Sequence, residues 1–167
     1  PDIPGLRERW GKDVNACPYC HGAEVAGRPL AVIASGPMGL HHAAMLRQWS
    51  QDVTFFSHLA GDIDEETLAG FAARGIRLVT EPVQEVVVDG DAVRAVVAGS
   101  RSYPVEAIFT GSTMHPSDAL LLGAGAETEM SPQGITVVTA PMGRTSVPGL
   151  YAAGNVINLA ATVPVSI

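Results

Sequence analysis

The chain has 167 residues, of which 47% are hydrophobic and 16% charged, so it is a globular sequence and neither disordered nor fibrous. Its formal net charge of −7 at pH 7, with no basic run, excludes nucleic acid as a partner. The best apolar run, residues 30–35, ends at Gly36 and Pro37 and is too short to span a membrane, so we expect no membrane association.

Residues 1–16 show no hydrophobic periodicity, and we expect an extended segment there. Charged residues, among them Asp2, Arg7 and Glu8, occupy the positions where a signal peptide would have its apolar stretch. A cytoplasmic location is therefore the prediction. The chain begins with Pro1 instead of methionine, so we expect a processed N-terminus or an internal piece of a longer chain.

The only two cysteines, Cys17 and Cys20, are spaced as a dithiol pair that can close a small disulfide. His21 follows directly and can exchange the proton that a dithiol releases or takes up near pH 7. The alternative is half of a zinc site. The other histidines offer no suitable second ligand pair, so we predict no metal.

A strand, a glycine-containing turn, a helix and a second strand follow in that order. Residues 29–35 form a continuous apolar run, typical of a strand buried on both faces. The helix after it has apolar residues at spacings of three and four: Leu40, Ala43, Ala44, Met45, Leu46 and Trp49. A second strand is predicted at residues 52–57, which completes one βαβ unit.

The next stretch predicts a second helix and the rest of the sheet. Asp64 is the expected N-cap of a helix that ends before Gly75. Two of the following apolar segments flank Asp89-Gly90, which predicts a hairpin. The expected strands are residues 76–80, 83–88, 92–98 and 105–110. The predicted fold class is α/β, a Rossmann-like fold with a parallel βαβαβ sheet and an inserted antiparallel β-meander.

The pattern changes after residue 112. A short helix at residues 117–122 and strands at residues 135–139 and 150–153 are predicted. These elements hold too little apolar area to form a core of their own. This part of the chain therefore needs something else to pack against.

The turn after the first strand has the pattern of a dinucleotide fingerprint whose first glycine is replaced by Ala34. In such a turn the middle glycine lets a pyrophosphate approach the backbone, and the last lets helix and strand pack closely. The predicted NAD(P)-binding residues are Ser35, Gly36, Pro37, Met38, Gly39 and, after the second strand, His58. The alternative is a purely structural turn, with His58 as a surface loop residue.

Five motifs, in this order, resemble those of the low-molecular-weight thioredoxin reductases and their dithiol-oxidase relatives, which are FAD-dependent pyridine nucleotide-disulfide oxidoreductases. They are Trp10-Gly11-Lys12-Asp13-Val14, Cys17-Pro18-Tyr19-Cys20-His21-Gly22, the fingerprint turn, Asp52-Val53-Thr54-Phe55-Phe56, and the stretch from Thr145 to Val156. The resemblance spans essentially the whole chain. It implies FAD and NADPH or NADH as cofactors.

By this resemblance, residues 1–12 are a linker from a missing half of the FAD domain, residues 13–112 the NAD(P)-binding domain with the redox dithiol, and residues 113–167 a partial C-terminal half of the FAD domain. The implied FAD contacts are Gly154, Asn155, Val156, Ala161 and Thr162. Asn155 stands where the family has an acidic residue, which keeps hydrogen bonding but removes the charge. The implied state is an internal fragment of a protein that forms a homodimer when full length.

The resemblance also implies a route for electrons. Reduced flavin passes them to the disulfide through Cys20, Cys17 attacks a substrate disulfide, and His21 serves as proton donor or acceptor. The implied partner is a thioredoxin-like protein or a small-molecule disulfide or dithiol. No arginine lies in residues 57–62, where the reductases bind the NADPH phosphate. The alternatives are therefore other contacts to NADPH, NADH as donor, or an oxidase that passes electrons from a dithiol to oxygen.

Two further hypotheses stay open. Cys-Pro-Tyr-Cys is also the signature of glutaredoxin-like modules, and Thr162-Val163-Pro164 mimics their proline loop, but His21-Gly22 and a strand follow where that fold needs a long helix. The chain is alternatively a non-catalytic nucleotide-binding fragment, because the first FAD fingerprint is absent from it.

Overall fold

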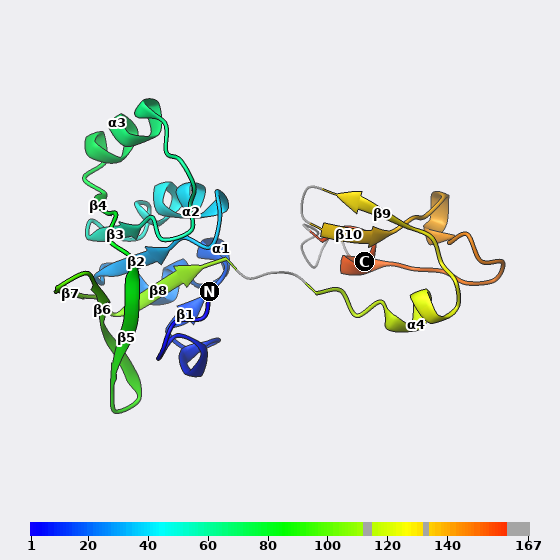
Figure 1. The fold of residues 1–167 in the computed structure, drawn as a ribbon, viewed down its shortest axis with the longest axis horizontal. Helices are drawn as coiled ribbons and strands as arrows, with labels where there is room; N and C mark the ends of the chain where they lie inside the picture. Colours follow the sequence, from blue (N-terminus) through cyan, green and yellow to red (C-terminus); the bar gives the residue numbers. More distant parts are fainter. Residues whose placement is uncertain (112–114, 132–133, 160–167) are drawn as a thin grey trace. The chain divides into compact units, whose positions relative to one another are not determined.

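A computed structural model of the chain describes residues 1–111, 115–131 and 134–159. The chain forms two compact units, Pro1–Ser112 and Thr113–Ile167 (Figure 1). None of the helices within the described residues has the length and hydropathy of a transmembrane segment.

The first unit is built on a five-stranded sheet in which every neighbouring pair is parallel. In spatial order its strands are β1 (Val14–Asn15), β8 (Ala107–Thr110), β2 (Leu30–Ile33), β3 (Val53–Phe56) and β4 (Arg77–Val79). Helix α2 (Met38–Leu46) connects β2 to β3, and α3 (Glu65–Ala73) connects β3 to β4. The predicted βαβαβ order is confirmed.

Local chemistry explains where α3 begins and ends. Asp64 is its N-cap, as predicted, and the Oδ1 atom accepts a hydrogen bond from the Thr67 amide at 2.7 Å. Backbone hydrogen bonding from Thr67 holds the pKa of the Asp64 carboxyl below its usual range, because the bond favours the charged form. The helix stops before Gly75, which has a φ of +65° that an L side chain rarely adopts.

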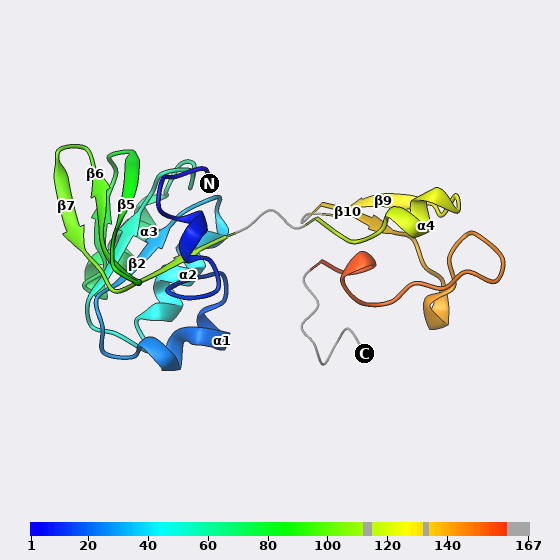
Figure 2. The ribbon, with the colours of Figure 1, turned by 90° about the horizontal axis from the view of Figure 1, so that it is seen from below.

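The predicted meander is a separate three-stranded antiparallel sheet (Figure 2). Its strands are β5 (Val83–Asp89), β6 (Ala92–Ala98) and β7 (Arg101–Pro104). The predicted β5–β6 hairpin is confirmed, but its two turn residues are Gly90 and Asp91, because Asp89 still pairs with Ala92. Strand β7 was not predicted, because its residues are polar or exposed and pair mainly through their backbone.

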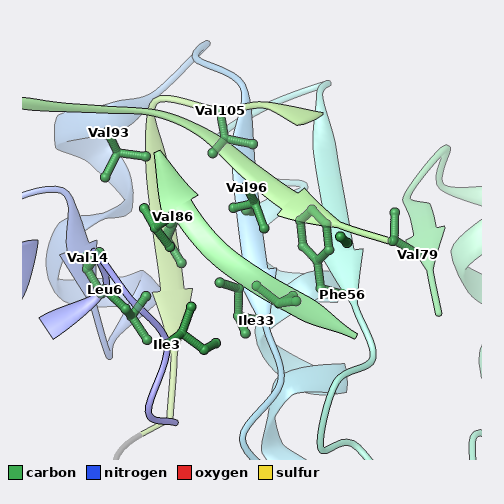
Figure 3. Packing of buried hydrophobic residues seen from close by; sticks show 14 residues of the cluster. Ile3, Leu6, Val14, Ile33, Phe56, Val79, Val86, Val93, Val96 and Val105 are labelled. Atoms are coloured by element: carbon green, nitrogen blue, oxygen red, sulfur yellow. The ribbon is translucent and has the colours of Figure 1, made fainter. Parts of the chain in front are cut away.

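The parallel sheet is buried on both faces, which explains its uninterrupted apolar strands. Along β2, Leu30 and Val32 pack with the helix-side cluster, and Ala31 and Ile33 pack with the meander-side cluster. The meander-side cluster contains the residues labelled in Figure 3: Ile3, Leu6, Val14, Ile33, Phe56, Val79, Val86, Val93, Val96 and Val105. The expectation of two-sided burial is confirmed.

The N-terminal segment is not extended, so this prediction was wrong. It contains a 3-10 helix, Arg7–Arg9, and buries Ile3 and Leu6 in the meander-side cluster. The Val86 amide also donates to the Pro4 carbonyl at 2.9 Å. Two apolar residues spaced for one turn are too few to register as periodicity, but they are enough to fix the segment to β5.

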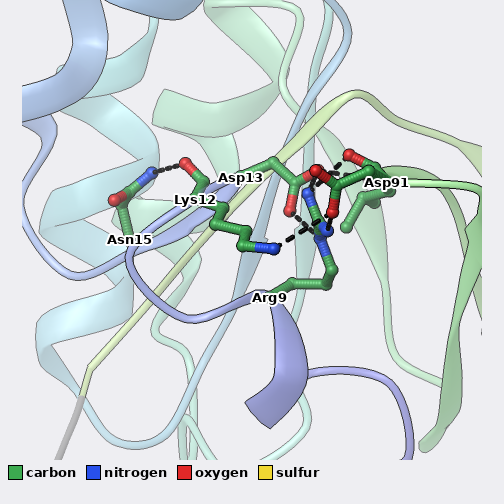
Figure 4. A network of polar contacts seen from close by, with 6 residues as sticks. Arg9, Lys12, Asp13, Asn15 and Asp91 are labelled. Carbon is green, nitrogen blue, oxygen red and sulfur yellow. Dashed lines mark hydrogen bonds and ion pairs between the residues drawn. The ribbon is translucent and has the colours of Figure 1, made fainter.

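A polar network reinforces this attachment (Figure 4). The guanidinium of Arg9, only 6% exposed, binds the Asp13 carboxylate through Nε at 2.7 Å and Nη2 at 2.9 Å. It also binds the side chain of Asp91, and donates to the Asp91 carbonyl at 2.8 Å. The second Asp13 oxygen accepts from the Val93 amide at 2.7 Å. Segment and hairpin are thereby joined by charge-assisted hydrogen bonds.

The second unit has short elements around a small apolar cluster. They are α4 (Ala119–Gly123), the antiparallel pair β9 (Thr128–Ser131) and β10 (Gly134–Val137), and the 3-10 turns Pro141–Gly143 and Gly154–Val156. The helix predicted at 117–122 and the strand predicted at 135–139 are confirmed with shifted bounds. The strand predicted at 150–153 is wrong, because only a single bridge joins Tyr151 to Arg144.

Many large apolar side chains of this unit are exposed: Leu120, Leu122, Met130, Ile135, Met142 and Tyr151. Burying such surface is favourable by about 25 cal/mol per Å². The exposure agrees with the expectation that these residues need a further surface to pack against.

Candidate functional site

The dithiol lies at the start of a short helix, α1 (Pro18–His21). Cys17 is its N-cap, and Pro18 occupies the first helical position, where no amide hydrogen is needed. Cys17 and Cys20 form a disulfide with Cα atoms 5.3 Å apart. The Cys20 amide donates to the Cys17 sulfur at 3.2 Å. In the reduced protein the same hydrogen bond would stabilise a thiolate on Cys17.

His21 is held by an acidic neighbour. Its Nδ1 atom lies 3.1 Å from Oε2 of Glu24. An ionised carboxylate only accepts hydrogen bonds, so Nδ1 carries the proton and Nε2 of the neutral ring is the atom able to take one up. The side chain of His21 is 40% exposed, so the ring is accessible to solvent.

A cavity of about 170 Å³ adjoins Cys17. Its lining residues are Trp10, Gly11, Val14, Asn15, Ala16, Cys17 and His21. Cys17 and His21 therefore share one cavity, whereas Cys20 is exposed and is not among its lining residues. Sequence reasoning did not assign Trp10 or Asn15 to the site. Trp10 belongs to the first of the motifs that carry the family resemblance, whereas the only signal for Asn15 was its closeness to the dithiol along the chain.

The fingerprint turn, residues 34–39, follows β2. A Cβ atom built on Gly36 meets no atom within 4 Å, so the backbone is open to a ligand at the middle glycine. A Cβ atom on Gly39 would lie 2.9 Å from Cβ of the buried Ala34. An alanine can replace the first glycine of the fingerprint because residue 34 does not have a positive φ. The methyl group of Ala34 fits because Gly39, which faces it, has no side chain.

The sheet brings the dithiol and the fingerprint turn to the same edge. Asn15 of β1 is in register with Phe109 of β8, which is in register with Val32 of β2. Cys17 and Ala34 each lie two residues further along, at the carboxyl ends of parallel strands. Their strands are separated by one intervening strand, which corresponds to roughly 10 Å at the usual spacing. Ligands of open α/β sheets bind at this edge.

His58 follows β3 at this same edge. The Leu59 amide donates to the Ala34 carbonyl at 3.1 Å, which ties the His58 loop to the fingerprint turn. Burial lowers the pKa of His58 below its ordinary value, because it disfavours the charged imidazolium. His58 is therefore neutral at pH 7.

The predicted FAD contacts that the structure describes lie in a turn of the second unit. Gly154 has a φ of +78°, and Asn155 donates through Nδ2 to the carbonyls of Asn158 at 3.4 Å and Leu159 at 3.3 Å. Ala161 and Thr162 lie outside the described residues, as does the Thr162-Val163-Pro164 stretch. Within residues 1–111, 115–131 and 134–159, no group of three His, Cys, Asp or Glu side chains is arranged to hold a metal ion.

Comparison with known proteins tests the resemblance deduced from the motifs. The pattern of the pyridine nucleotide-disulphide oxidoreductases matches residues 1–167. The chain belongs to this family. The resemblance deduced from the motifs is confirmed, and the α/β fold agrees with that of solved members.

Individual relatives give the same result. The chain is 30% identical over 160 residues to thioredoxin reductase tcpT of Claviceps purpurea, covering 92% of this chain and 50% of that protein. It is 33% identical to an alkyl hydroperoxide reductase of Pseudomonas aeruginosa, covering 97% and 31%. The crystal structure of HlmI matches with a TM-score of 0.86 at 40% identity, covering 99% of this chain and 51% of that one. The chain spans about half or less of each of these proteins.

The two glycines of the family's fingerprint turn should respond differently to substitution. Gly39→Ala is expected to lower the free energy of unfolding by about 1–2 kcal/mol, because the new methyl group overlaps Ala34. Gly36→Ala, the matched control, should change it by less than about 0.5 kcal/mol, because its methyl group points into open space. Urea unfolding of both variants measures this. Equal destabilisation of the two variants would contradict the packing described for Gly39.

Proposed function

We propose that this chain is the part of a flavin-dependent disulfide oxidoreductase, similar to thioredoxin reductase, that carries the nicotinamide site and the redox dithiol. The observation that carries the proposal is the shared sheet edge of the Cys17–Cys20 disulfide and the open fingerprint turn at Gly36. A structural disulfide has no reason to lie beside a nucleotide site. A working dithiol needs an electron donor within reach.

Thiol–disulfide exchange at this site follows from the geometry. The Cys17 thiolate, stabilised by the Cys20 amide, attacks one sulfur of a substrate disulfide and releases the other as a thiolate. His21 takes the proton of the Cys17 thiol and passes it to the released sulfur. Cys20 then loses its proton and attacks Cys17, which leaves the Cys17–Cys20 disulfide and frees the second substrate sulfur, the acceptor of that proton. The substrate gains one electron pair, and the dithiol loses one.

The cofactors proposed are FAD and NADPH or NADH. Bound FAD would supply the electron pair that reopens the disulfide, and exposed Cys20 is the sulfur available to face it. Ser35, Gly36, Pro37, Met38 and Gly39 would hold the nicotinamide dinucleotide through the turn and the start of α2. In the second unit Gly154, Asn155 and Val156 would hold part of FAD, together with Ala161 and Thr162.

The domain assignment proposed is residues 1–12 as a linker, residues 13–112 as the NAD(P)-binding domain and residues 113–167 as part of the FAD domain. The exposed apolar side chains of the second unit support a missing complementary half. We also propose a homodimer for the full-length protein and, because a working dithiol suits a reducing compartment, a cytoplasmic location. Light scattering that returned the mass of one chain would contradict the dimer.

The substrate proposed is a thioredoxin-like protein or a small-molecule disulfide. Relatives of this chain are named both thioredoxin reductase and alkyl hydroperoxide reductase, so the family name alone does not select between substrates. A second candidate, a dithiol oxidase that runs the exchange backwards and passes electrons to oxygen, is favoured by one observation. No arginine lies in residues 57–62, directly after β3, where an NADPH phosphate would bind.

An electron-donor test separates these functions. Purified full-length protein should be yellow, and NADPH or NADH should bleach its flavin absorbance within the time of turnover. Bleaching by a dithiol and not by either nucleotide would favour the oxidase. A full-length protein without flavin would contradict both the reductase and the oxidase. The remaining hypothesis would be a non-catalytic nucleotide-binding protein.

A further inference from the structure

The cavity beside Cys17 has an uncharged, mostly apolar lining. Trp10, Val14 and Ala16 contribute apolar surface, and Gly11 contributes backbone. The polar side chains are the Asn15 amide, the Cys17 sulfur and His21. No Lys, Arg, Asp or Glu is among the lining residues. Because burying an unpaired charge is costly, such a lining favours an uncharged ligand group.

Trp10 forms part of this cavity although it contributes little to the core. Its side chain is 48% exposed, which is unusual for the largest apolar residue unless a ligand or partner covers it. Tyr19, between the two cysteines, is 73% exposed but does not line the cavity. The two aromatic residues near the dithiol therefore differ in what they can contact.

The backbone around Trp10 is fixed on both sides. The Trp10 amide donates to the Arg7 carbonyl at 3.2 Å, and the Gly11 amide donates to the Val14 carbonyl at 2.9 Å. Arg9 and Asp13, joined by their double hydrogen bond, flank the turn (Figure 4). Because this backbone is already held, little backbone entropy is lost when a ligand contacts the indole.

The size of the cavity limits what it can accept. Its volume of about 170 Å³ is well below the roughly 300 Å³ at which pockets for drug-sized ligands begin. One ring with its sulfur atoms fits, whereas a folded protein surface does not enter. We propose that the cavity is a subsite for the uncharged, apolar group next to the reacting sulfur of a small-molecule disulfide, and that Trp10 determines this preference.

This proposal rests on the proposed function, because it assumes that Cys17 is the attacking sulfur. In the step concerned, the Cys17 thiolate forms a bond to one substrate sulfur while the substrate S–S bond breaks. The departing sulfur remains attached to the same ring in a cyclic disulfide and takes its proton from His21. Contact of that ring with the indole holds the scissile bond in line with Cys17.

The test traps the mixed disulfide in the full chain with Cys20→Ser, which removes the resolving thiol. Intact-mass measurement gives the rate of adduct formation with diphenyl disulfide, an uncharged acyclic disulfide that leaves one ring on Cys17 and releases the other as a free thiol, with glutathione disulfide, which is charged and flexible, and with an oxidised thioredoxin domain. Trp10→Ala in this background should lower the ratio of the diphenyl disulfide rate to the glutathione rate about tenfold, as expected for losing one aromatic contact. Trp10→Phe should restore most of the ratio.

Tyr19→Ala is the matched aromatic control, and it should leave the ratio within about twofold. An unchanged ratio in Trp10→Ala overturns the subsite while adducts at Cys17 still support the proposed function. A thioredoxin rate that falls as much as the diphenyl disulfide rate also overturns it, because the indole would then contact a protein partner. No adduct with any probe in the Cys20→Ser parent contradicts the proposed function itself.

Discussion

Cys17→Ser is expected to abolish disulfide reduction by the full-length protein, with a loss of turnover of roughly a thousandfold or more. The reason is that Cys17 is the sulfur that caps α1, lines the cavity and accepts the Cys20 amide. A hydroxyl at this position is not ionised near pH 7 and cannot replace the thiolate. The measurement is steady-state reduction of a disulfide substrate with NADPH or NADH as donor.

Two variants separate the roles of neighbouring groups. Cys20→Ser should also lose turnover but retain adduct formation at Cys17, whereas Cys17→Ser should form no adduct. His21→Ala keeps both thiols and should lose about a hundredfold in turnover, the usual contribution of a positioned proton donor. Substantial turnover in Cys17→Ser would show that Cys20 or another group attacks the substrate.

Asp13→Ala is expected to lower the free energy of unfolding of the chain by about 3 kcal/mol, the usual result of removing one partner of a buried ion pair. Asp13 is 16% exposed, and its loss would leave the Arg9 guanidinium and the Val93 amide without their carboxylate. Chemical unfolding followed by far-UV circular dichroism measures the change. Lys12→Ala is the matched control, because its ion pair with Asp91 is largely exposed and should matter little.

The stability difference between the parent chain and Asp13→Ala should decrease as the pH falls. Burial raises the pKa of this carboxyl, but its hydrogen bonds from Arg9 and the Val93 amide outweigh burial, so the net pKa lies below the usual value. The stabilisation is therefore fully present above the unfolded-state pKa, about 3.9, and is lost as pH falls through the lower folded-state value. A stability difference between parent and Asp13→Ala that persisted unchanged at pH 2 would contradict this network.

The sequence predicts the central strands β2, β3 and β8 well because they are fully buried and mostly apolar. Strand β1 was not predicted, because it has only two residues, Val14 and Asn15. Prediction from sequence fails for elements that are held by backbone hydrogen bonds or by residues far away in the chain. Strand β7 is paired through backbone groups of Arg101–Pro104, and the N-terminal segment is fixed by Arg9 to Asp91, which is 82 positions away. Neither contact leaves a local hydrophobic pattern.

In the candidate site, too, local sequence patterns were predictable and long-range contacts were not. The spacing of Cys17 and Cys20, the adjacent His21 and the glycines at 36 and 39 are local signals, so they were identified from the sequence. The contribution of Trp10 to a cavity depends on how the turn at Gly11 folds back toward Val14. The shared edge of dithiol and fingerprint turn depends on β1 and β2 both pairing with β8, a strand more than seventy residues further along the chain.

The most direct test is an anaerobic reductive titration of the flavin-loaded full-length protein and its Cys17→Ser variant. If the Cys17–Cys20 disulfide exchanges electrons with flavin, the wild-type protein takes up two electron pairs, one for the flavin and one for the disulfide, and the variant takes up only one. A wild-type protein that takes up a single pair and retains its disulfide would contradict the proposed role of this dithiol.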